Sequence, residues 1–463
     1  MRTFRDAIQF GTESLGVKGM YRFHLPLHAG FRFYSRWKQA SFSYAIVMKF
    51  PFRFPVGPLL LLFFSLPLML SASDDIHPPT KGGEGGRLIR VTSLEGEGKG
   101  SLRQALWAKG RRIIVFEVGG VIDLEGRSLN IGEPFVTIAG QTAPSPGITL
   151  VRGGLTVNTH DVIVKHLRVR PGEAGKAKGS GWEADGISLF QASNVWVDHC
   201  SCTWATDENL SASGPRFEGK SVEDWRKNTS HRVLFSNNII AEALSNSTHS
   251  KGEHSKGSLL HDNTSDITIA RNLYASNFRR NPLAKGGVRA VIVNNWISNP
   301  GRAAIAYGLN TSEWKGNRIQ PGNLVIVGNV LEHGPDTADK VVLFENLSVS
   351  PVNAWMIDNV AAGKNGQAVA QTQGYSINVS NTKVNMTMID AIPSSKVKEF
   401  VASNAGARPW DRDEIDERIV RQALAGRGKI IDSEKEVGGY PKIKATRSGF
   451  APADWNLKTM EKK

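Results

Sequence analysis

Acidic residues lie at the margins of two short alternating segments near the middle of the sequence. Glu183 and Asp185 come just before the first segment, and Asp207 and Glu208 come just after the second. If both segments are strands, their ends can bring the four carboxylates to one place, and oxygen ligands gathered in this way suit a hard cation such as Ca2+. The alternative interpretation, that these acids are solvated loop residues, is open at this point.

A repeated pattern runs through the elements that would position these acids. Each copy has alternating apolar residues, an Asn or His near its middle, and a second apolar pair. The copies lie at 162–169, 195–202, 233–240, 267–274, 291–298, 324–331 and 355–360. Their spacing, about two dozen to just under forty residues, is typical of a parallel β-helix, in which stacked coils supply the core that one coil cannot form.

Asparagines recur near the middle of four copies, and we expect their side-chain amides to form a ladder from coil to coil. They are Asn238, Asn272, Asn295 and Asn329. A β-sandwich would need hairpin turns such as Asn-Gly at short intervals, and these are scarce. The pattern predicts an all-β chain: a right-handed single-stranded parallel β-helix, with a short N-terminal capping helix at 101–107 and a C-terminal helix at 411–425 followed by an extended segment.

The second copy also contains the two cysteines of the chain, Cys200 and Cys202. One residue apart in a strand, they would point to the same face, which is a poor geometry for a disulfide. A C-x-C pair without further cysteines is also a weak metal motif, so we expect two core residues. His199 alternates with Val195 and Val197 and is expected to point inward or into the coil stack, which argues against a catalytic role.

The N-terminal region has the layout of a secretory signal peptide. Met48 is followed by basic residues, an apolar run (Leu59–Leu70) and three small residues. We therefore expect a signal peptide at 48–73 and a disordered upstream extension at 1–47. The competing interpretation is a signal anchor with a basic cytoplasmic tail, although the apolar run is short for a membrane span.

The remaining chain is expected to form a β-helical catalytic domain at 74–400 and a C-terminal segment at 401–463 that packs on it. The formal net charge of the full chain is +14, half of it in residues 1–73, and it favours polyanionic partners. Acidic polysaccharide and nucleic acid both qualify by charge. A nucleic-acid binder would need aromatic platforms among its basic residues, and a secretory signal argues against it. We expect a secreted monomer without stable membrane association after signal removal.

Four stretches of the sequence resemble one known family. They are G-S-L-R-Q-A-L at 100–106 with I-I-V-F-E-V-G-G at 113–120, D-G-I-S-L-F-Q-A-S-N-V-W-V-D-H-C-S at 185–201, H-S-K-G-S-L-L at 254–260, and R-N-P-L-A-K followed by V-N-N within 280–295. Residues from about 82 to 400 thereby resemble the secreted pectate lyases of the parallel β-helix type, polysaccharide lyase family 1. The combination of V-W-V-D-H-C-S with R-x-P and N-N is the specific part of the likeness.

The resemblance implies calcium bound by acids on neighbouring coils. Carried over to this sequence, the ligands are Glu183 and Asp185 in W-E-A-D-G and Asp207 in T-D-E-N-L-S. Where the family pattern has another Asp, four residues after Asp207, this chain has Ser211. Either Glu208 or water compensates, or calcium binds weakly until the substrate supplies its own carboxylates.

The resemblance also places cationic residues in the site. Arg280, the first residue of R-x-P, matches the catalytic arginine, and Lys285 stands where the family has a second Arg. Lys keeps the charge but loses the bidentate fork, so its contact to a substrate carboxylate would be weaker. Arg279 and Arg289 are further candidates for substrate contacts. A solvated surface charge is the alternative for each of them.

Lys256 matches the substrate-contacting lysine of the family, and Lys251 sits in a duplicate H-S-K. In β-elimination on a uronate, a base removes the proton at C5 and the C4 oxygen leaves, while charge builds on the C6 carboxylate. Cations aimed at that carboxylate stabilise the developing charge. Arginine is normally protonated, so Arg280 can act as the base only if its surroundings lower its pKa. Lys256 is the reserve base.

The predicted function is a calcium-dependent pectate lyase that acts on polygalacturonate. One alternative is a β-helix lyase for another uronate polymer or for methylated pectin, for which the departures at Ser211 and Lys285 leave room. Another is a polysaccharide-binding β-helix without catalytic activity.

Overall fold

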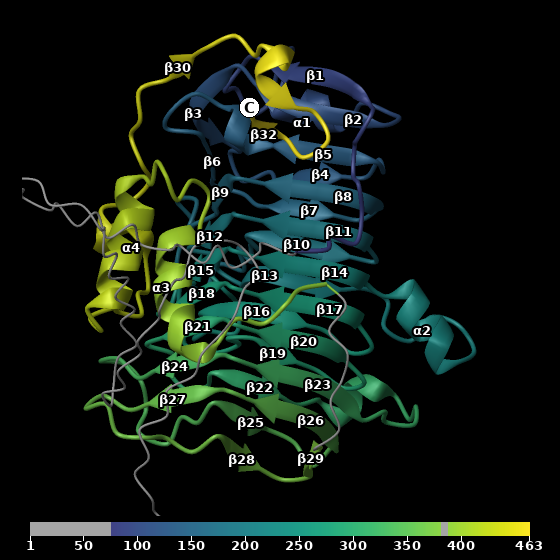
Figure 1. Ribbon diagram of the computed structural model, residues 1–463, viewed down its shortest axis with the longest axis vertical. Coiled ribbons are helices and arrows are strands. Elements are labelled where there is room, and N and C mark those ends of the chain that lie inside the picture. Colours follow the sequence, from purple (N-terminus) through teal and green to yellow (C-terminus); the bar gives the residue numbers. More distant parts are fainter. Residues whose placement is uncertain (1–75, 381–387) are drawn as a thin grey trace, which may run out of the picture. The chain divides into compact units, whose positions relative to one another are not determined.

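The computed structural model describes residues 76–380 and 388–463. In these ranges, short strands pass in turn through three sheets, and the strands of each sheet stack along a common axis (Figure 1). No helix among the described residues has the length and apolar composition needed to cross a bilayer. The predicted upstream extension (1–47) and signal peptide (48–73) lie outside the described residues.

The three sheets contain eleven, nine and ten strands in the described part of the chain. The eleven-stranded sheet consists of β1 (Arg87–Val91), β2 (Arg112–Phe116), β5 (Val136–Ala139), β8 (His160–Lys165), β11 (Ser193–Asp198), β14 (His231–Ser236), β17 (Ser265–Ala270), β20 (Arg289–Val293), β23 (Gly322–Val327), β26 (Val352–Ile357) and β29 (Ile377–Ser380). The nine-stranded sheet consists of β4 (Leu129–Ile131), β7 (Leu155–Val157), β10 (Ile187–Phe190), β13 (Glu208–Ser213), β16 (Lys256–Leu260), β19 (Leu283–Ala284), β22 (Ile305–Tyr307), β25 (Phe344–Asn346) and β28 (Thr372–Gly374). The ten-stranded sheet consists of β3 (Val118–Asp123), β6 (Ile148–Val151), β9 (Leu167–Arg170), β12 (Ser201–Thr203), β15 (Ile239–Ala241), β18 (Leu273–Ala275), β21 (Trp296–Ser298), β24 (Val330–Glu332), β27 (Val360–Ala362) and β30 (Thr446–Arg447).

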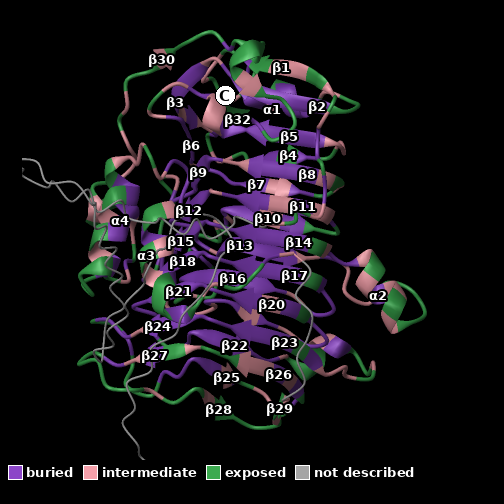
Figure 2. Cartoon of the chain, viewed as in Figure 1, coloured by how far each residue is buried: buried purple, intermediate pink, exposed green. Residues whose placement is uncertain are grey.

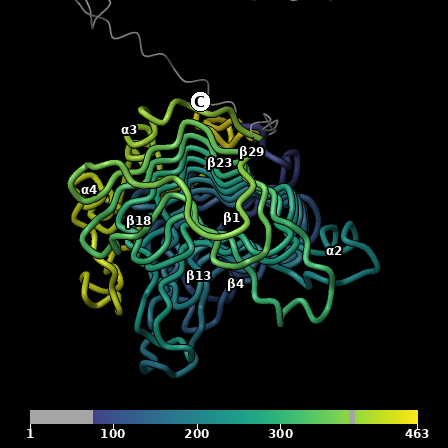
Figure 3. The backbone as a smooth tube through the Cα atoms, turned by 90° about the horizontal axis from the view of Figure 1, so that it is seen from below, coloured from purple at the N-terminus to yellow at the C-terminus, as the bar shows by residue number. Residues whose placement is uncertain are grey.

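Successive coils pair in parallel, and equivalent residues stand opposite each other. Val195 of β11 pairs with Val233 of β14, and Ile187 of β10 pairs with Leu210 of β13. Seen along the stack, the coils lie over one another around a shared interior (Figure 3). The predicted parallel β-helix is thus confirmed.

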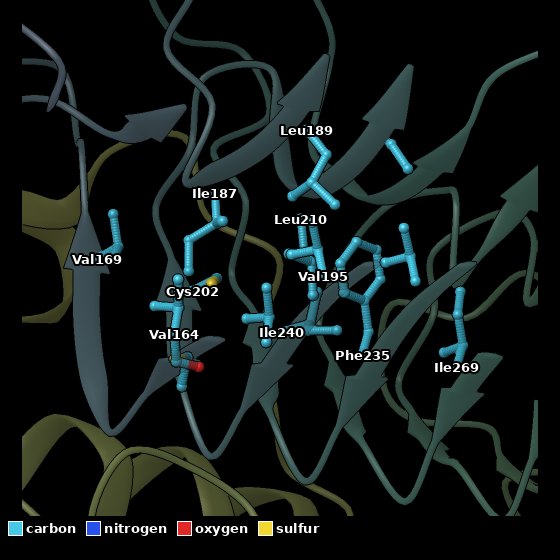
Figure 4. Close-up of a cluster of buried hydrophobic side chains, with 14 of the residues drawn as sticks. Val164, Val169, Ile187, Leu189, Val195, Cys202, Leu210, Phe235, Ile240 and Ile269 are labelled. Carbon is cyan, nitrogen blue, oxygen red and sulfur yellow. The ribbon is translucent and has the colours of Figure 1, made fainter. Parts of the chain in front are cut away.

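The interior is filled by the apolar residues of the alternating pattern. Figure 4 shows side chains from all three sheets, such as Leu189, Phe235 and Ile240, directed into the same space, and Figure 2 shows that the stacked strands are mostly buried. Cys200 and Cys202 are buried in this core and are not joined to each other. The expectation of two core cysteines without a disulfide is confirmed.

An asparagine ladder joins the coils at the bend between the eleven-stranded and ten-stranded sheets. The amide of Asn238 donates to the side-chain oxygen of Asn272 at 2.9 Å, and Asn272 donates to Asn295 at the same distance. Asn295 donates to Asn329 at 3.0 Å. The same oxygens accept backbone N–H groups at the bend, so the ladder satisfies main-chain donors that neither sheet pairs. The predicted ladder is confirmed.

Of the two positions expected for His199, the structure shows the coil stack and not the core. Each predicted repeat is two strands that meet at a bend, and in the second copy His199 occupies the bend with φ of 47°. A left-handed residue interrupts the alternation of side chains, so the period that places Val195 and Val197 inward does not extend to His199. Its imidazole is 22% exposed, shares a hydrogen bond with Asp198 and stacks on His166.

Two short helices follow local signals. Helix α1 (Leu102–Leu106) begins after Ser101, whose side chain accepts a hydrogen bond from the backbone of Gln104, and it packs Leu102 and Leu106 onto the core beside the first coils. It is the predicted capping helix. Helix α2 (Val222–Asn228) projects from a loop that follows β13 (Figure 1).

The C-terminal helices cover the outside of the ten-stranded sheet. Helices α3 (Ser394–Asn404) and α4 (Glu414–Leu424) pack on outward-facing residues such as Trp204 and Trp296. Helix α4 lies within the predicted helix at 411–425, and α3 spans the predicted domain boundary at residue 400.

Buried ion pairs add to this contact. The guanidinium of Arg170 reaches Asp413 at 2.6 Å and Asp416 at 2.8 Å, and the Ser201 hydroxyl donates to Asp416 at 2.7 Å. These charges are paired with one another inside the contact, which lets them lie buried.

The last residues return to the first coils. Strand β30 pairs antiparallel with β3, and the hairpin of β31 (Trp455–Asn456) and β32 (Glu461–Lys462) carries Met460 against β2. Single turns of 3-10 helix complete the described structure: η1 (Gly140–Thr142), η2 (Thr311–Trp314), η3 (Glu434–Val437) and η4 (Pro452–Asp454).

We expect Asn272→Ala to lower the free energy of unfolding by about 2–4 kcal/mol, because it leaves buried donors and acceptors on two coils without partners. The measurement is the urea midpoint followed by circular dichroism. Asn323→Ala is the matched control, since Asn323 is exposed and its side chain makes only exposed hydrogen bonds, one from the amide of Asn353 and one to the carbonyl of Pro321. Equal midpoints for the two variants would contradict the structural role of the ladder.

Candidate functional site

The loops that lead from the ten-stranded sheet to the nine-stranded sheet bring acids of two coils together. Asp185 lies two residues before β10, Asp207 ends the loop before β13, and Glu208 is the first residue of β13. Carboxylate oxygens of these three residues lie within 4.8 Å of one another. The stacking of β10 on β13 positions them, because the end of one loop lies directly over the end of the next.

The three carboxylates are crowded. Asp185 accepts hydrogen bonds from the backbone N–H of Glu208 at 3.0 Å and from the hydroxyl of Ser211 at 3.2 Å. Burial and the charge of Asp207 nevertheless raise the pKa of Asp185 to about 7. Burial also raises the pKa of Asp207, but the hydrogen bond from His254 and nearby positive charges outweigh it and lower that pKa. Burial and the repulsion between Asp185 and Asp207 therefore make full ionisation of this group costly unless positive charge lies beside it.

Glu183 is not part of this group, although it is only two residues from Asp185. Its carboxylate accepts hydrogen bonds from the backbone and the hydroxyl of Ser250 and lies 3.3 Å from Nδ1 of His249. The contacts with Ser250 lower the pKa of Glu183. The loop before β10 directs the two acids to different partners, and the role of Glu183 as a calcium ligand stays a prediction.

Two of the predicted cations lie against the three acids. Arg280, in the loop before β19, forms an ion pair with Glu208, and burial lowers the pKa of Arg280 although Asp207 and Asp185 oppose the shift. Lys256 begins β16 and stands opposite Glu208 in the strand register. Burial and the charge of Arg279 lower the pKa of Lys256 to about 8.

Lys285 lies beyond the other end of these short strands. Its ammonium is 2.7 Å from the carboxylate of Glu313 and 3.5 Å from that of Asp262. Arg216 reaches the same Glu313 oxygen at 2.8 Å. Glu313 also acts electrostatically on Arg280 and opposes the lowering of its pKa.

Arg279 and Arg289 are placed differently from each other. The Arg279 guanidinium lies over the ring of Phe278, with 5.2 Å to its centroid, and the carbonyl of Arg279 accepts from Gly257 beside Lys256. Arg289 belongs to β20 of the eleven-stranded sheet, where it lines a pocket together with Arg232. Of the predicted cations, Arg289 is on a different sheet from the acids, and its role in substrate binding stays a prediction.

Two histidines of the site escaped the sequence analysis. His254 shares a hydrogen bond with Asp207, with 2.7 Å between Nε2 and Oδ1, and stacks on His249. Both belong to the doubled H-S-K motif, in which the resemblance to the family points only to the lysines. The motif itself could have indicated them, because both histidines come shortly before β16, and the neighbouring strand β13 begins with the acid Glu208.

Comparison with known proteins agrees with this architecture. The family model described as pectate lyase matches residues 127–409, more than half of the chain. The chain is 32% identical over 369 residues to a probable pectate lyase C of Emericella nidulans, covering 77% of this chain and 76% of that protein. It is 30% identical over 392 residues to a probable pectate lyase C of Aspergillus flavus, covering 82% and 83%.

Solved structures share the fold at lower identity. The cedar pollen allergen jun a 1 superposes with a TM-score of 0.51 at 17% identity, over 71% of this chain and 90% of that chain. A pectate lyase bound to a hexasaccharide also gives 0.51, at 13% identity, over 71% and 94%. With its stacked parallel coils and its match to the family model, the chain belongs to the pectate lyase family of β-helical polysaccharide lyases.

Proposed function

We propose that the protein is a calcium-dependent pectate lyase that cleaves polygalacturonate by β-elimination. The observation that carries the proposal is the meeting of three carboxylates, Asp185, Asp207 and Glu208, within 4.8 Å beside the cations Arg280 and Lys256. Acids and cations side by side in one half-buried surface suit a substrate that is itself a polyanion and reacts next to a carboxylate.

The residues present fit calcium. Asp185, Asp207 and Glu208 offer only oxygen ligands, and burial together with the charge of Asp207 raises the pKa of Asp185, a shift that a bound cation would oppose. Calcium, when bound by these three residues, supplies positive charge for the substrate carboxylate as charge develops there. Ser211, in place of a further acid, holds Asp185 by a hydrogen bond and adds no charge.

Arg280 is assigned the removal of the proton at C5, because burial lowers its pKa and the acids hold its guanidinium in the site. The electron pair of the broken C–H bond forms the C4–C5 double bond, and the C4 oxygen leaves with the sugar and takes a proton from solvent. Lys256, and Lys285 at the far end of the strands, are assigned to the uronate carboxylates. Lys256 is the second candidate for the base, since its pKa of about 8 is closer to neutrality.

The direct test uses the mature chain with polygalacturonate, methylated pectin and alginate, each with calcium or a chelator. The absorbance of unsaturated uronides reports β-elimination. We expect product from polygalacturonate with calcium only. Product from methylated pectin or alginate, but not from polygalacturonate, would identify a lyase for that polymer. Binding without product would identify a polysaccharide-binding protein without catalytic activity.

We also propose that the protein acts outside the cell after removal of residues 48–73. The support is the layout of that segment and the polymeric substrate, which is found outside cells. Sequencing of the mature N-terminus tests it: a retained apolar run at 59–70 would contradict the signal peptide.

We expect Arg280→Lys to lower kcat on polygalacturonate by about two to four orders of magnitude, the range in which a positioned base contributes. The shorter, differently directed ammonium cannot take the same position as the guanidinium. The matched control is Arg427→Lys, an exposed arginine after α4, which we expect to keep full activity. Activity close to that of the unchanged protein in Arg280→Lys would transfer the role of the base to Lys256.

Asp185→Asn is expected to raise the calcium concentration for half-maximal activity at least about tenfold, because fewer charged ligands weaken calcium binding. The measurement is a calcium titration of activity after chelator treatment. Asp339→Asn, whose carboxylate is fully exposed, is the control. An unchanged calcium requirement in Asp185→Asn would exclude this group as the calcium site.

Ser211→Asp is expected to have opposite effects on stability with and without calcium. A fourth acid beside Asp185 adds repulsion to the calcium-free protein and a charged ligand to the calcium-bound one. Thermal unfolding with chelator and with calcium measures both, and the calcium-induced rise of Tm is expected to be larger than in the unchanged protein. A smaller rise would show that position 211 does not face the bound ion.

A further inference from the structure

His249 and His254 make a compact set of potential metal ligands with Asp207. The imidazole rings stack with 3.7 Å between centroids and an interplanar angle of 16°. Nε2 of His254 is 2.7 Å from one carboxylate oxygen of Asp207, and Nε2 of His249 is 3.8 Å from the other. One ligand atom from each of the three residues lies within 4.8 Å of the others. Two nitrogens and one oxygen thus lie close enough together to share one ion.

The Nε2 atom of His249 is buried and lacks a hydrogen-bond partner among the described residues. The His249 side chain is 1% exposed. A buried polar nitrogen without a partner costs about 1–3 kcal/mol. The atom faces the carboxylate of Asp207 at a distance too long for a hydrogen bond, which leaves space for an ion between them.

The opposite side of the same ring has a carboxylate partner. Nδ1 of His249 lies 3.3 Å from Glu183. A carboxylate that holds the proton on Nδ1 leaves the lone pair on Nε2, which is the arrangement of many metal-ligating histidines. The backbone N–H of Lys251, 3.0 Å from the same Nδ1, favours the other tautomer. Nε2 lacks a hydrogen-bond partner in both tautomers, and a bound ion would select the first.

We propose that His249, His254 and Asp207 bind a divalent transition metal ion of the zinc class, at a site adjacent to the calcium site and sharing Asp207 with it. Imidazole nitrogen suits zinc and its neighbours, whereas calcium prefers oxygen, so the ligand type separates the two sites. Asp207 is 28% exposed and gives the ion a path from solvent. Three protein ligands leave a further position for water. The proposal goes beyond the lyase function and does not depend on the substrate.

The test is a titration of the mature chain, free of any affinity tag, with Zn2+ in the presence of saturating Ca2+. We expect about one bound equivalent by calorimetry. His249→Gln and His254→Gln are each expected to weaken the binding at least about tenfold, the loss that a disturbed ligand set brings. His160→Gln, an exposed histidine on β8, is the matched control and keeps the affinity. Equal affinity in all three variants would overturn the proposal.

A second measurement uses the unchanged protein and does not depend on variants that fold. Co2+ in place of Zn2+ should give visible absorption bands that added Zn2+ removes and added Ca2+ does not. The absence of such bands would overturn the site. Asp185→Asn is expected to keep the Zn2+ affinity within about threefold while its calcium response changes. Lyase inactivity with Zn2+ binding intact would therefore count against the proposed function and not against this site.

Discussion

The stacking of coils is the constraint on which the rest of the structure depends. A single coil has a narrow apolar face and cannot bury it, so its inward residues are covered only when the next coil pairs with it in register. Parallel pairing sets neighbouring strands about 4.8 Å apart and aligns equivalent positions, as Val195 with Val233 and Ile187 with Leu210. The asparagine ladder pins the same register at the bends.

The site follows from this register. Asp185, Asp207 and Arg280 are far apart in the sequence, yet each lies where the chain enters the nine-stranded sheet: Asp185 before β10, Asp207 before the next strand β13, and Arg280 before β19, two coils further on. Their proximity requires no dedicated scaffold. Loops between the sheets can differ in length without moving these positions, because the strands that follow them hold the alignment.

Two charged clusters show what separates a functional surface from a structural one. Between α4 and the β-helix, the guanidinium of Arg170 is matched by Asp413 and Asp416, and the buried charges are paired with one another. At the site, the pKa of Asp185 rises to about 7 and that of Lys256 falls to about 8, because neighbouring like charges and burial are not fully compensated. Such residual imbalance is typical of sites that take up a charged ligand.

The sequence by itself determined the fold class, the family and most of the charged residues of the site. Period-two apolar positions and recurring asparagines are local patterns in the sequence. They recur in every coil because each coil buries its inward face only against similar neighbouring coils. The alternation could not decide between the core and the coil stack for His199, since a left-handed bend residue interrupts it. Only the tertiary structure separated Glu183 from Asp185, placed Lys285 against Glu313 and set His249 and His254 beside Asp207. These contacts depend on the paths of loops, which have no period in the sequence and acquire their neighbours only when the coils stack.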